Sequence, residues 1–386
     1  MKSFEEDMLT MIENVKFRKV NDAFQDVLKK DIQTLKKSDK MFIPADKTRN
    51  FYKVDQNTYA KLLRENITKT YKTANKNAYE VINTEAKKIA NRLDIDDRMD
   101  ILAKKQAFIT LKDHKPNFNS NPTCRLINPT KSEMGRVSKQ ILDRINTSIR
   151  SITSVNQWRN STSVIDLFKK IPDKPKNTFI TFDIVNFYPS ITEDILQKSI
   201  DFARQHVTIP DEDIEIITHS RKSLLFDNDS PWMKRENKDM FDVTMGSYDG
   251  AEVCELVGLY ILDVLAQKYN KDQIGLYRDD GLAAFKNISG STAERTKKDI
   301  CRVFRELGLK ITIEANLKIV NFLDITLNLN NGKFYPFRKP NDNPVYINKQ
   351  SNHPPTIIRH LPASISRRIT TISNDEDIFN EAAPPL

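Results

Sequence analysis

Hydrophobic residues in the first hundred positions recur with the three-to-four-residue spacing of amphipathic helices. The clearest examples are residues 24–35 and 79–93, and a short Pro-Ala-Asp-Lys segment at 44–47 lies between them. Such helices bury one face and leave the other in water. We therefore expect a mostly helical N-terminal region without a catalytic motif of its own.

Two apolar runs with strand character follow, at 107–111 (AFITL) and 124–127 (CRLI). Between them lie the polar segment K-D-H-K-P and a loop rich in Asn, Ser and Pro. This arrangement predicts a basic hairpin or pair of strands. A helix is expected next, over about residues 132–149, and a cluster of prolines at 172 and 175 ends the region.

The central part of the chain alternates between strand and helix patterns. A β-branched and aromatic run at 178–182 predicts a strand that ends at Asp183. Thr192 is the expected N-cap of the next helix, whose acidic first turn suits the helix dipole. Apolar residues at three-to-four spacing over 251–269 predict another helix, packed beneath a sheet.

The composition is that of an ordinary globular protein: 386 residues, of which 39% are hydrophobic and 9% aromatic. The three cysteines, at 124, 254 and 301, lie far apart and lack the spacing of a zinc site. The sequence contains neither an apolar signal segment nor an apolar run of about 18 residues. We expect a soluble intracellular protein, nuclear or cytoplasmic, without a membrane partner and with reduced thiols.

The net charge of +9 is unevenly distributed along the chain. Residues 101–178 contain 15 Lys and Arg against 5 Asp and Glu, whereas residues 179–331 contain 18 against 25. Residues 332–372 are basic again, with 7 against 1. Basic flanks around an acidic centre suit a protein that binds a phosphate backbone and holds metal ions. A solvated, lysine-rich surface is the alternative explanation.

Adjacent carboxylates occupy a predicted tight turn between two short apolar strands. Residues 274–277 (IGLY) and 282–285 (LAAF) flank it, and Asp279 and Asp280 stand together at its tip. Such a pair is electrostatically costly without a cation. Asp183 is the natural partner, because magnesium binds a few carboxylates together with substrate phosphates. An ordinary surface turn is the alternative for an isolated Asp-Asp-Gly.

These acidic motifs resemble those of reverse transcriptases. Residues 182–191 (FDIVNFYPSI) are similar to the first palm motif of that family, and residues 277–280 (YRDD) match its Y-x-D-D signature. The resemblance implies that Asp183 and Asp279 are catalytic and bind two Mg²⁺ ions, for which Mn²⁺ can substitute. It also implies that Asp280 supports the same catalytic metal site.

The resemblance extends to residues that contact the nucleotide. Tyr188 stands where the family places the side chain that crowds the sugar 2′ position; a core tyrosine is the alternative. Residues 244–248 (TMGSY) resemble the P-Q-G-S-P loop, whose glycine, here Gly246, lets the backbone approach template and nucleotide. Met245 departs from the usual glutamine. Three nearby acids are either additional functional groups or exposed helix positions: Asp249, Glu252 and Glu255.

The basic region resembles the fingers motifs of the same family, at residues 108–116 and 124–129. By this resemblance Arg125 grips the triphosphate, a role that suits its bidentate guanidinium, and Lys112 or Lys115 assists. A solvated surface role is the alternative for each of these lysines.

Two downstream segments also resemble reverse-transcriptase motifs. Residues 304–318 are similar to the fourth palm motif, and Lys318 is then the lysine expected to protonate pyrophosphate. Residues 322–327 (FLDITL) are similar to the hairpin that holds the primer end, although composition alone indicates only an amphipathic strand.

Segments at both ends resemble Penelope-like retroelement enzymes in particular. These are P-A-D-K at 44–47, F-R-K-P-N-D at 337–342 and S-N-H-P-P at 351–355. Many members of that family carry a GIY-YIG endonuclease, whose pattern this sequence lacks. We therefore expect either a truncated copy or a type without the endonuclease.

Together these patterns predict an α+β right-hand polymerase with an antiparallel palm sheet backed by helices. The expected divisions are an N-terminal helical extension at 1–100, fingers at 101–178, a palm at 179–331 and a partial thumb at 332–386. The predicted activity is RNA-directed DNA synthesis for a retroelement, in which deoxynucleoside triphosphates extend a DNA primer on an RNA template.

Three alternatives remain open from the sequence. The first is a catalytically impaired, reverse-transcriptase-like protein that only binds nucleic acid, and the intact acids at 183, 279 and 280 argue against it. The second is an RNA-dependent RNA polymerase, against which Tyr188 argues. The third is a metal-dependent nuclease or phosphatase, which the absence of histidine near the acidic pair disfavours. The oligomeric state is open.

Overall fold

The computed structural model describes residues 2–14, 23–48, 50–99, 104–113, 115, 117–118, 120, 122–236, 239–288, 290–338, 347 and 353–383. Most of the Penelope-like segments at 337–342 and 351–355 lies outside these residues. No helix in the described part of the chain is both long enough and apolar enough to cross a membrane.

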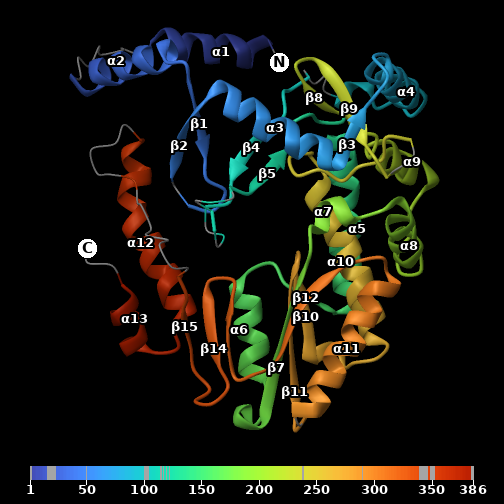
Figure 1. Cartoon of the computed structure of the whole chain (residues 1–386), viewed down its shortest axis with the longest axis vertical. Helices are drawn as coiled ribbons and strands as arrows, with labels where there is room; N and C mark the ends of the chain where they lie inside the picture. The colour runs from blue at the N-terminus through green and yellow to red at the C-terminus, as the bar shows by residue number, and fades with distance from the viewer. Residues whose placement is uncertain are drawn as a thin grey trace.

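A five-stranded sheet, called the central sheet below, lies in the lower half of the molecule as drawn in Figure 1. Its strands, in order across the sheet, are β12 (Ile311–Leu317), β7 (Asn177–Ile184), β11 (Asp280–Lys286), β10 (Ile274–Tyr277) and β6 (Asn156–Gln157). Neighbouring strands are antiparallel, except that β6 runs parallel to β10. At the other edge, β12 has a register shift between Glu314 and Leu317.

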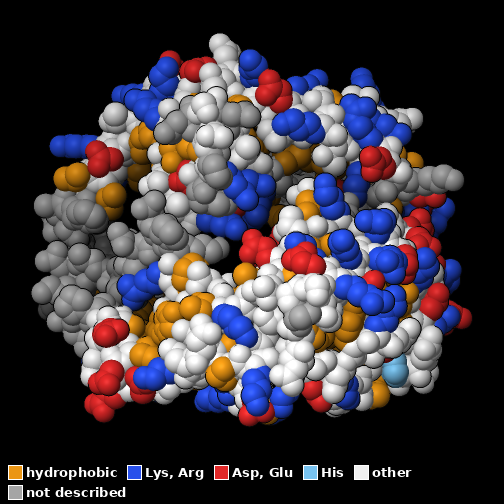
Figure 2. All heavy atoms as spheres, turned by 60° about the horizontal axis from the view of Figure 1, so that its bottom comes forward, with side chains coloured by type: hydrophobic (Ala, Val, Ile, Leu, Met, Phe, Trp, Pro, Cys, Tyr) orange, Lys and Arg blue, Asp and Glu red, His pale blue; other side chains and the backbone are white. Residues whose placement is uncertain are grey.

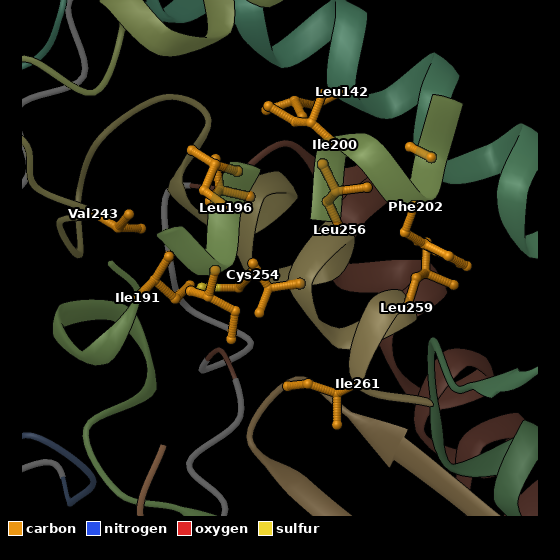
Figure 3. Close-up of a cluster of buried hydrophobic side chains, with 14 of the residues drawn as sticks. Leu142, Ile191, Leu196, Ile200, Phe202, Val243, Cys254, Leu256, Leu259 and Ile261 are labelled. Carbon is orange, nitrogen blue, oxygen red and sulfur yellow. The ribbon is translucent and has the colours of Figure 1, made fainter. Parts of the chain in front are cut away.

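Helices cover one face of this sheet and form the largest hydrophobic core with it. Alternate residues of β7, such as Ile180 and Phe182, belong to this core. Figure 3 shows Ile200, Leu256 and other apolar side chains of the helices within it. The helices of this layer are α5 (Gly135–Thr153), α8 (Glu193–Arg204), α9 (Asp211–His219), α10 (Gly250–Ala266) and α11 (Gly290–Glu306).

Several predicted elements are confirmed in this layer. The helix expected over 132–149 is α5, and the helix expected over 251–269 is α10. Thr192 is the N-cap of α8, and its hydroxyl accepts a hydrogen bond of 3.3 Å from the Ile195 N–H. The antiparallel sheet backed by helices is therefore present.

A second hydrophobic core lies on the opposite face of the sheet. Phe179 and Leu282 face it from the central strands. Helix α12 (Pro355–Ile372) lies on this side and continues through an internal proline, Pro362. The remaining elements of this side are α6 (Ser161–Lys170), β13 (Ile319–Phe322), β14 (Ile325–Asn328), β15 (Phe334–Pro336) and α13 (Glu376–Ala382).

The first hundred residues contain strands that the helical pattern did not predict. Helices α2 (Ala23–Lys37) and α4 (Ala78–Arg92) match the two amphipathic stretches. Between them, however, β1 (Lys40–Pro44) and β2 (Phe51–Asp55) pair as an antiparallel hairpin. Residues of β2 alternate between exposure and partial burial, whereas those of β1 do not, and each strand has only five residues, which is too short a signal beside long helical repeats.

These upstream strands share a core with the basic strands that follow them. Ile43, Ile67 and Tyr71 pack in one cluster with Ile109 and Trp232. The expected boundary at residue 100 therefore does not divide this cluster, because residues on both sides of it pack together. The elements concerned are α3 (Gln56–Thr70), β3 (Tyr71–Thr73), β4 (Phe108–Leu111), β5 (Cys124–Ile127), β8 (Leu225–Asp227) and β9 (Ser230–Lys234).

The predicted pair of basic strands is confirmed, because β4 pairs with β5 in antiparallel register. The other described elements are short or peripheral: α1 (Lys2–Glu13), α7 (Phe187–Ser190), η1 (Asp96–Arg98), η2 (Lys174–Lys176) and η3 (Lys271–Gln273).

A buried ion pair ties the start of α10 to the chain that follows α9. The side chains of Arg221 and Asp249 are 1% and 0% exposed, and Arg221 Nη2 contacts Asp249 Oδ1. The hydroxyl of Ser220 donates to Asp249 Oδ2 over 2.7 Å. Removing one partner of such a pair leaves a buried charge uncompensated.

We predict that Asp249→Ala lowers the free energy of unfolding by about 3–5 kcal/mol, because Arg221 loses its buried counter-ion. The matched control is Asp194→Ala, which removes an exposed carboxylate paired with Lys198 and should cost less than about 1 kcal/mol. Urea denaturation followed by circular dichroism measures both. Equal losses in the two variants would contradict the prediction.

Candidate active site

Asp183 lies on the face of the central sheet that the main helix layer does not cover. Ile180, Phe182 and Ile184 of β7 belong to the helix core, so the alternation of a strand turns Asp183 to the other face. Asp280 is the register partner of Asp183 on β11. Directly opposed residues share one face of a sheet, with Cβ atoms about 5 Å apart. Strand pairing therefore brings these two carboxylates together.

Asp279 comes from the turn that joins β10 to β11. Tyr277 pairs with Asp280, so Arg278 and Asp279 form a two-residue turn and the predicted hairpin is confirmed. The Ile184 N–H donates to the Asp279 carbonyl over 2.9 Å. This bond fixes the turn beside the end of β7, where Asp183 lies.

A glycine next to the carboxylates, Gly281, lets an aromatic ring of the neighbouring strand pack directly against its backbone. Gly281 is the register partner of Phe182, and a Cβ on Gly281 would overlap the Phe182 ring. The ring also packs against Phe304 of α11, at 5.3 Å between ring centroids. The strand carrying Asp280 is therefore seated on the helix layer by contact with this ring.

Asp183 and Asp279 both line a cavity of about 530 Å³. Burial and then the charge of Asp279 raise the pKa of Asp183, while Lys47 and Lys115 lower it. Like charges held this close destabilise one another unless a proton or a cation intervenes. The pair is therefore a place where a bound cation would relieve repulsion.

The side chains of this site can supply only some of the ligands that a magnesium ion needs. Among the residues the structure describes, no three His, Cys, Asp or Glu side chains converge closely enough to hold a metal ion. Magnesium prefers hard oxygen ligands and is commonly held by one or two carboxylates together with substrate phosphates. Asp183 and Asp279 meet that requirement, and the remaining ligands would have to come from a substrate and water.

Basic side chains gather in the same cavity. Figure 2 shows Lys and Arg side chains facing Asp and Glu side chains across a hollow near the middle of the molecule. Burial and then the charge of Arg125 lower the pKa of Lys112. Such crowding of positive charge favours binding of a polyanion. The basic residues that line the cavity are Lys47, Lys69, Lys112, Lys115 and Arg125.

Tyr188 also lines the cavity and is held from behind by a buried network. Burial raises the pKa of Tyr188 to about 12, so its hydroxyl keeps its proton at neutral pH. The carbonyl of the next residue, Pro189, accepts a hydrogen bond of 2.5 Å from Lys234 Nζ. Lys234 is in turn 3.5 Å from the buried carboxylate of Asp242. This network fixes the turn that carries the Tyr188 ring.

Gly246 occupies a position that only glycine fits. Its φ is +111°, and a Cβ would lie 2.8 Å from the Asn128 carbonyl oxygen. Thr244 and Met245, just before it, line the cavity. The close approach to Asn128 joins this loop to the basic strand β5 at the cavity wall.

Lys318 is not part of this cavity, and the expected role on pyrophosphate does not fit its position. Its Nζ donates to the carbonyls of Pro175 and Asn177, over 2.9 Å and 2.5 Å. Asn177 begins β7 and Asp183 lies near its end, so about 20 Å of strand separates them. The motif predicts that the lysine follows β12. It does not predict at which end of the sheet the lysine side chain lies.

The three acids near the start of α10 are neither exposed nor part of the cavity. Asp249 and Glu252 are buried and Glu255 is half-buried, which corrects the expectation of exposed helix positions. Each forms an ion pair with a basic side chain from another segment. The amphipathic spacing of a single helix does not predict such distant partners. The pairs are Asp249 with Arg221, Glu252 with Lys139 and Glu255 with Arg150.

The Pro-Ala-Asp-Lys segment contributes to the cavity although its sequence indicated no role there. Lys47 lines the cavity, and Asp46 Oδ1 lies 3.0 Å from Arg125 Nη1. The resemblance at 44–47 marked the segment, but nothing in the sequence connected it with Arg125.

No protein-family model matches this sequence, and no curated protein matches it. Solved structures do match the fold. Telomerase from Candida albicans in complex with a fragment of telomeric RNA has a TM-score of 0.57 at 10% identity, over 86% of this chain. Apo telomerase from Candida tropicalis has a TM-score of 0.54 at 9% identity, over 83% of this chain.

These matches show the fold and not the chemistry, because the sequence identities are low. The chain spans 58% and 62% of the lengths of those two telomerase chains. The predicted fold class is confirmed: the protein has an α+β, reverse-transcriptase-like right-hand polymerase fold, whose palm sheet is the five-stranded sheet that carries Asp183.

We predict that Gly281→Ala lowers the free energy of unfolding by about 1–3 kcal/mol, because the new methyl group overlaps the Phe182 ring. Gly290→Ala is the matched control, since the nearest atom to its new Cβ is 3.7 Å away. Thermal unfolding measures both variants. Combining Gly281→Ala with Phe182→Leu should recover part of the loss, and a control as unstable as Gly281→Ala would refute the explanation.

Proposed function

We propose that this chain is the RNA-directed DNA polymerase of a retroelement of the Penelope-like type. One observation carries the proposal: Asp183, at the end of β7, and Asp279, in the turn that is bonded to Ile184, share a cavity with a cluster of basic side chains. Carboxylates beside cations suit a metal-bound triphosphate. The polymerase fold and the reverse-transcriptase-like motifs at 182–191 and 277–280 support it.

In this proposal Asp183 and Asp279 hold Mg²⁺, and Asp280 adds negative charge beside them on the same sheet face. Mg²⁺ held by these residues would supply Lewis-acid chemistry, lowering the pKa of the primer 3′-hydroxyl and offsetting charge on the phosphoryl oxygens. The hairpin and its bond to Ile184 keep the two carboxylates in place before substrate arrives. Preorganisation of this kind limits the rearrangement needed during the reaction.

The basic residues bind the triphosphate. Arg125 can engage two phosphate oxygens through its planar fork, and Lys112 adds a second positive charge. Tyr188 lies where its ring can meet the sugar and exclude a 2′-hydroxyl. The ring would do so by steric contact, and its hydroxyl keeps its proton at neutral pH. Gly246 lets its loop lie against Asn128 at the cavity wall, which keeps Thr244 and Met245 beside the proposed nucleotide.

The expected partners are an RNA template, a DNA primer and deoxynucleoside triphosphates. The excess of basic residues at 101–178 and 332–372 on either side of the palm suits the phosphate backbones. The retroelement assignment rests on the sequence resemblance at 44–47 and in the downstream segments.

We predict that Asp279→Asn lowers primer extension by at least about a hundredfold, because one of the two metal-binding carboxylates is lost. The assay is extension of oligo(dT) on poly(rA) with Mg²⁺. Asp201→Asn, an exposed position on α8, makes the same charge change and should leave the rate unchanged. Extension by the Asp279 variant at the wild-type rate, or by no form of the protein, would count against this active site.

We predict that Tyr188→Ala raises incorporation of ribonucleotides relative to deoxyribonucleotides by about tenfold or more, since the ring no longer crowds the 2′ position. Competition between matched ribo- and deoxyribonucleoside triphosphates on the same primer measures the ratio. If the wild type already prefers ribonucleotides, the protein is an RNA-dependent RNA polymerase instead. An unchanged ratio in the variant removes the sugar-excluding role from Tyr188.

A further inference from the structure

The triphosphate side of the cavity includes a turn from far upstream in the chain. This upstream turn is residues 45–50, of which all but Arg49 are described. It joins β1 to β2, and Lys47 at its tip lines the cavity with Lys112 and Arg125. Residues 51–107 separate the turn from the strand β4 that it reaches, so the contact is a property of the fold.

Backbone bonds attach the upstream turn to the edge of β4. The Asp46 N–H donates to the Leu111 carbonyl over 2.7 Å, and Ala45 forms a parallel bridge with Leu111. The Ala45 N–H donates to the Asn50 carbonyl over 2.9 Å, which closes the turn. The position of Asp46 relative to the basic strands is therefore fixed by the main chain.

Side-chain bonds hold the same turn from the other side. The carboxylate of Asp113 accepts hydrogen bonds from Thr48, from Asn50 over 3.0 Å and from the Tyr52 hydroxyl over 3.0 Å. Asp113 directly follows Lys112 in the chain. The turn and the lysine-bearing loop are thus one connected unit, and movement of either would disturb the other.

The carboxylate of Asp46 is aimed at the guanidinium of Arg125. Asp46 Oδ1 lies 3.0 Å from Arg125 Nη1, and the Asp46 side chain is only 6% exposed while that of Arg125 is 33% exposed. A guanidinium carries five N–H donors, so an ion pair through one terminal nitrogen leaves donors for a phosphate. A buried carboxylate behind a half-exposed arginine holds that arginine in one orientation toward the cavity.

We propose that the upstream turn is part of the nucleotide site. In this site Asp46 positions Arg125 for the triphosphate, and Lys47 contributes a further phosphate-binding cation. This inference rests on the proposed polymerase function. It gives the Pro-Ala-Asp-Lys segment a defined task, and it makes β1 and β2 necessary to nucleotide binding. The rival explanation is that the ion pair only fastens the upstream strands to β5.

Steady-state primer extension with dTTP separates the two explanations. Asp46→Asn keeps the shape of the side chain and removes its charge. We expect the KM for dTTP to rise about tenfold while kcat stays within about twofold, because binding and not chemistry is impaired. A melting temperature and a primer–template affinity equal to those of the wild type accompany this result. A fall in kcat and melting temperature with unchanged KM would favour the fastening role and overturn the proposal.

A double-mutant cycle tests whether Asp46 acts through Arg125. In an Arg125→Gln background, Asp46→Asn should change KM by less than about twofold, since its target is already gone. An equal, multiplicative effect of Asp46→Asn with and without Arg125 would show that Asp46 acts independently and would overturn the positioning role.

Lys47 has a matched control on the neighbouring strand. Lys47→Gln should raise the KM for dTTP about fivefold or more, and increasing salt should shrink the difference between the variant and the wild type. Lys53→Gln removes the same charge from an exposed position of β2 that does not line the cavity, and should leave KM unchanged. Equal effects of the two variants would show a general charge effect and overturn the assignment of Lys47.

Binding of inorganic tripolyphosphate distinguishes failure of this inference from failure of the polymerase proposal. Isothermal titration needs no catalysis, so it applies even if the wild type extends no primer. We expect Asp46→Asn and Lys47→Gln each to weaken binding at least about fivefold, with Lys53→Gln unchanged. Wild-type affinity in both variants would overturn the inference, whatever the outcome of primer extension.

Discussion

The repulsion between acidic side chains at one end of the central sheet is the constraint on which the rest of the site depends. Asp183 and Asp280 face each other across paired strands, and Asp279 sits at the adjoining turn. Opposed like charges destabilise a strand pair. The pairing survives because the opposite face of both strands is buried in the helix layer, where Phe182 and its neighbours pack. Hydrophobic burial on one face thus stabilises an unfavourable electrostatic arrangement on the other.

The sequence predicted the parts of the structure that local patterns determine. Apolar runs beside Asp183 and around Asp279 predicted strands and a tight turn, and strand pairing then brought these acids together without further information. The N-cap at Thr192 was predictable for the same reason, since the hydrogen bond closes within three residues. Resemblance to reverse transcriptases added the expectation that Asp183, Asp279 and Asp280 belong to one site.

What the sequence did not predict depends on contacts between distant segments. Asp249 is buried because Arg221 neutralises it, and neither residue alone indicates this. Lys318 follows its motif, yet the length of β12 carries it to the far end of the sheet. The hairpin of β1 and β2 has only five-residue strands, and its packing against Ile109 of β4 is what stabilises it. Each of these outcomes follows from tertiary packing that no local pattern contains.

The edges of the central sheet bear on solubility. A strand edge exposes unpaired N–H and C=O groups that can recruit another chain, and proteins limit this by keeping edge strands short or irregular. One edge here ends in β6, which is two residues long, and the other in β12, whose register shift falls beside Asn316 with a φ of 62°. Both ends of the sheet are therefore poor templates for a further strand. The palm keeps a long apolar strand pair at its centre while resisting edge-to-edge aggregation.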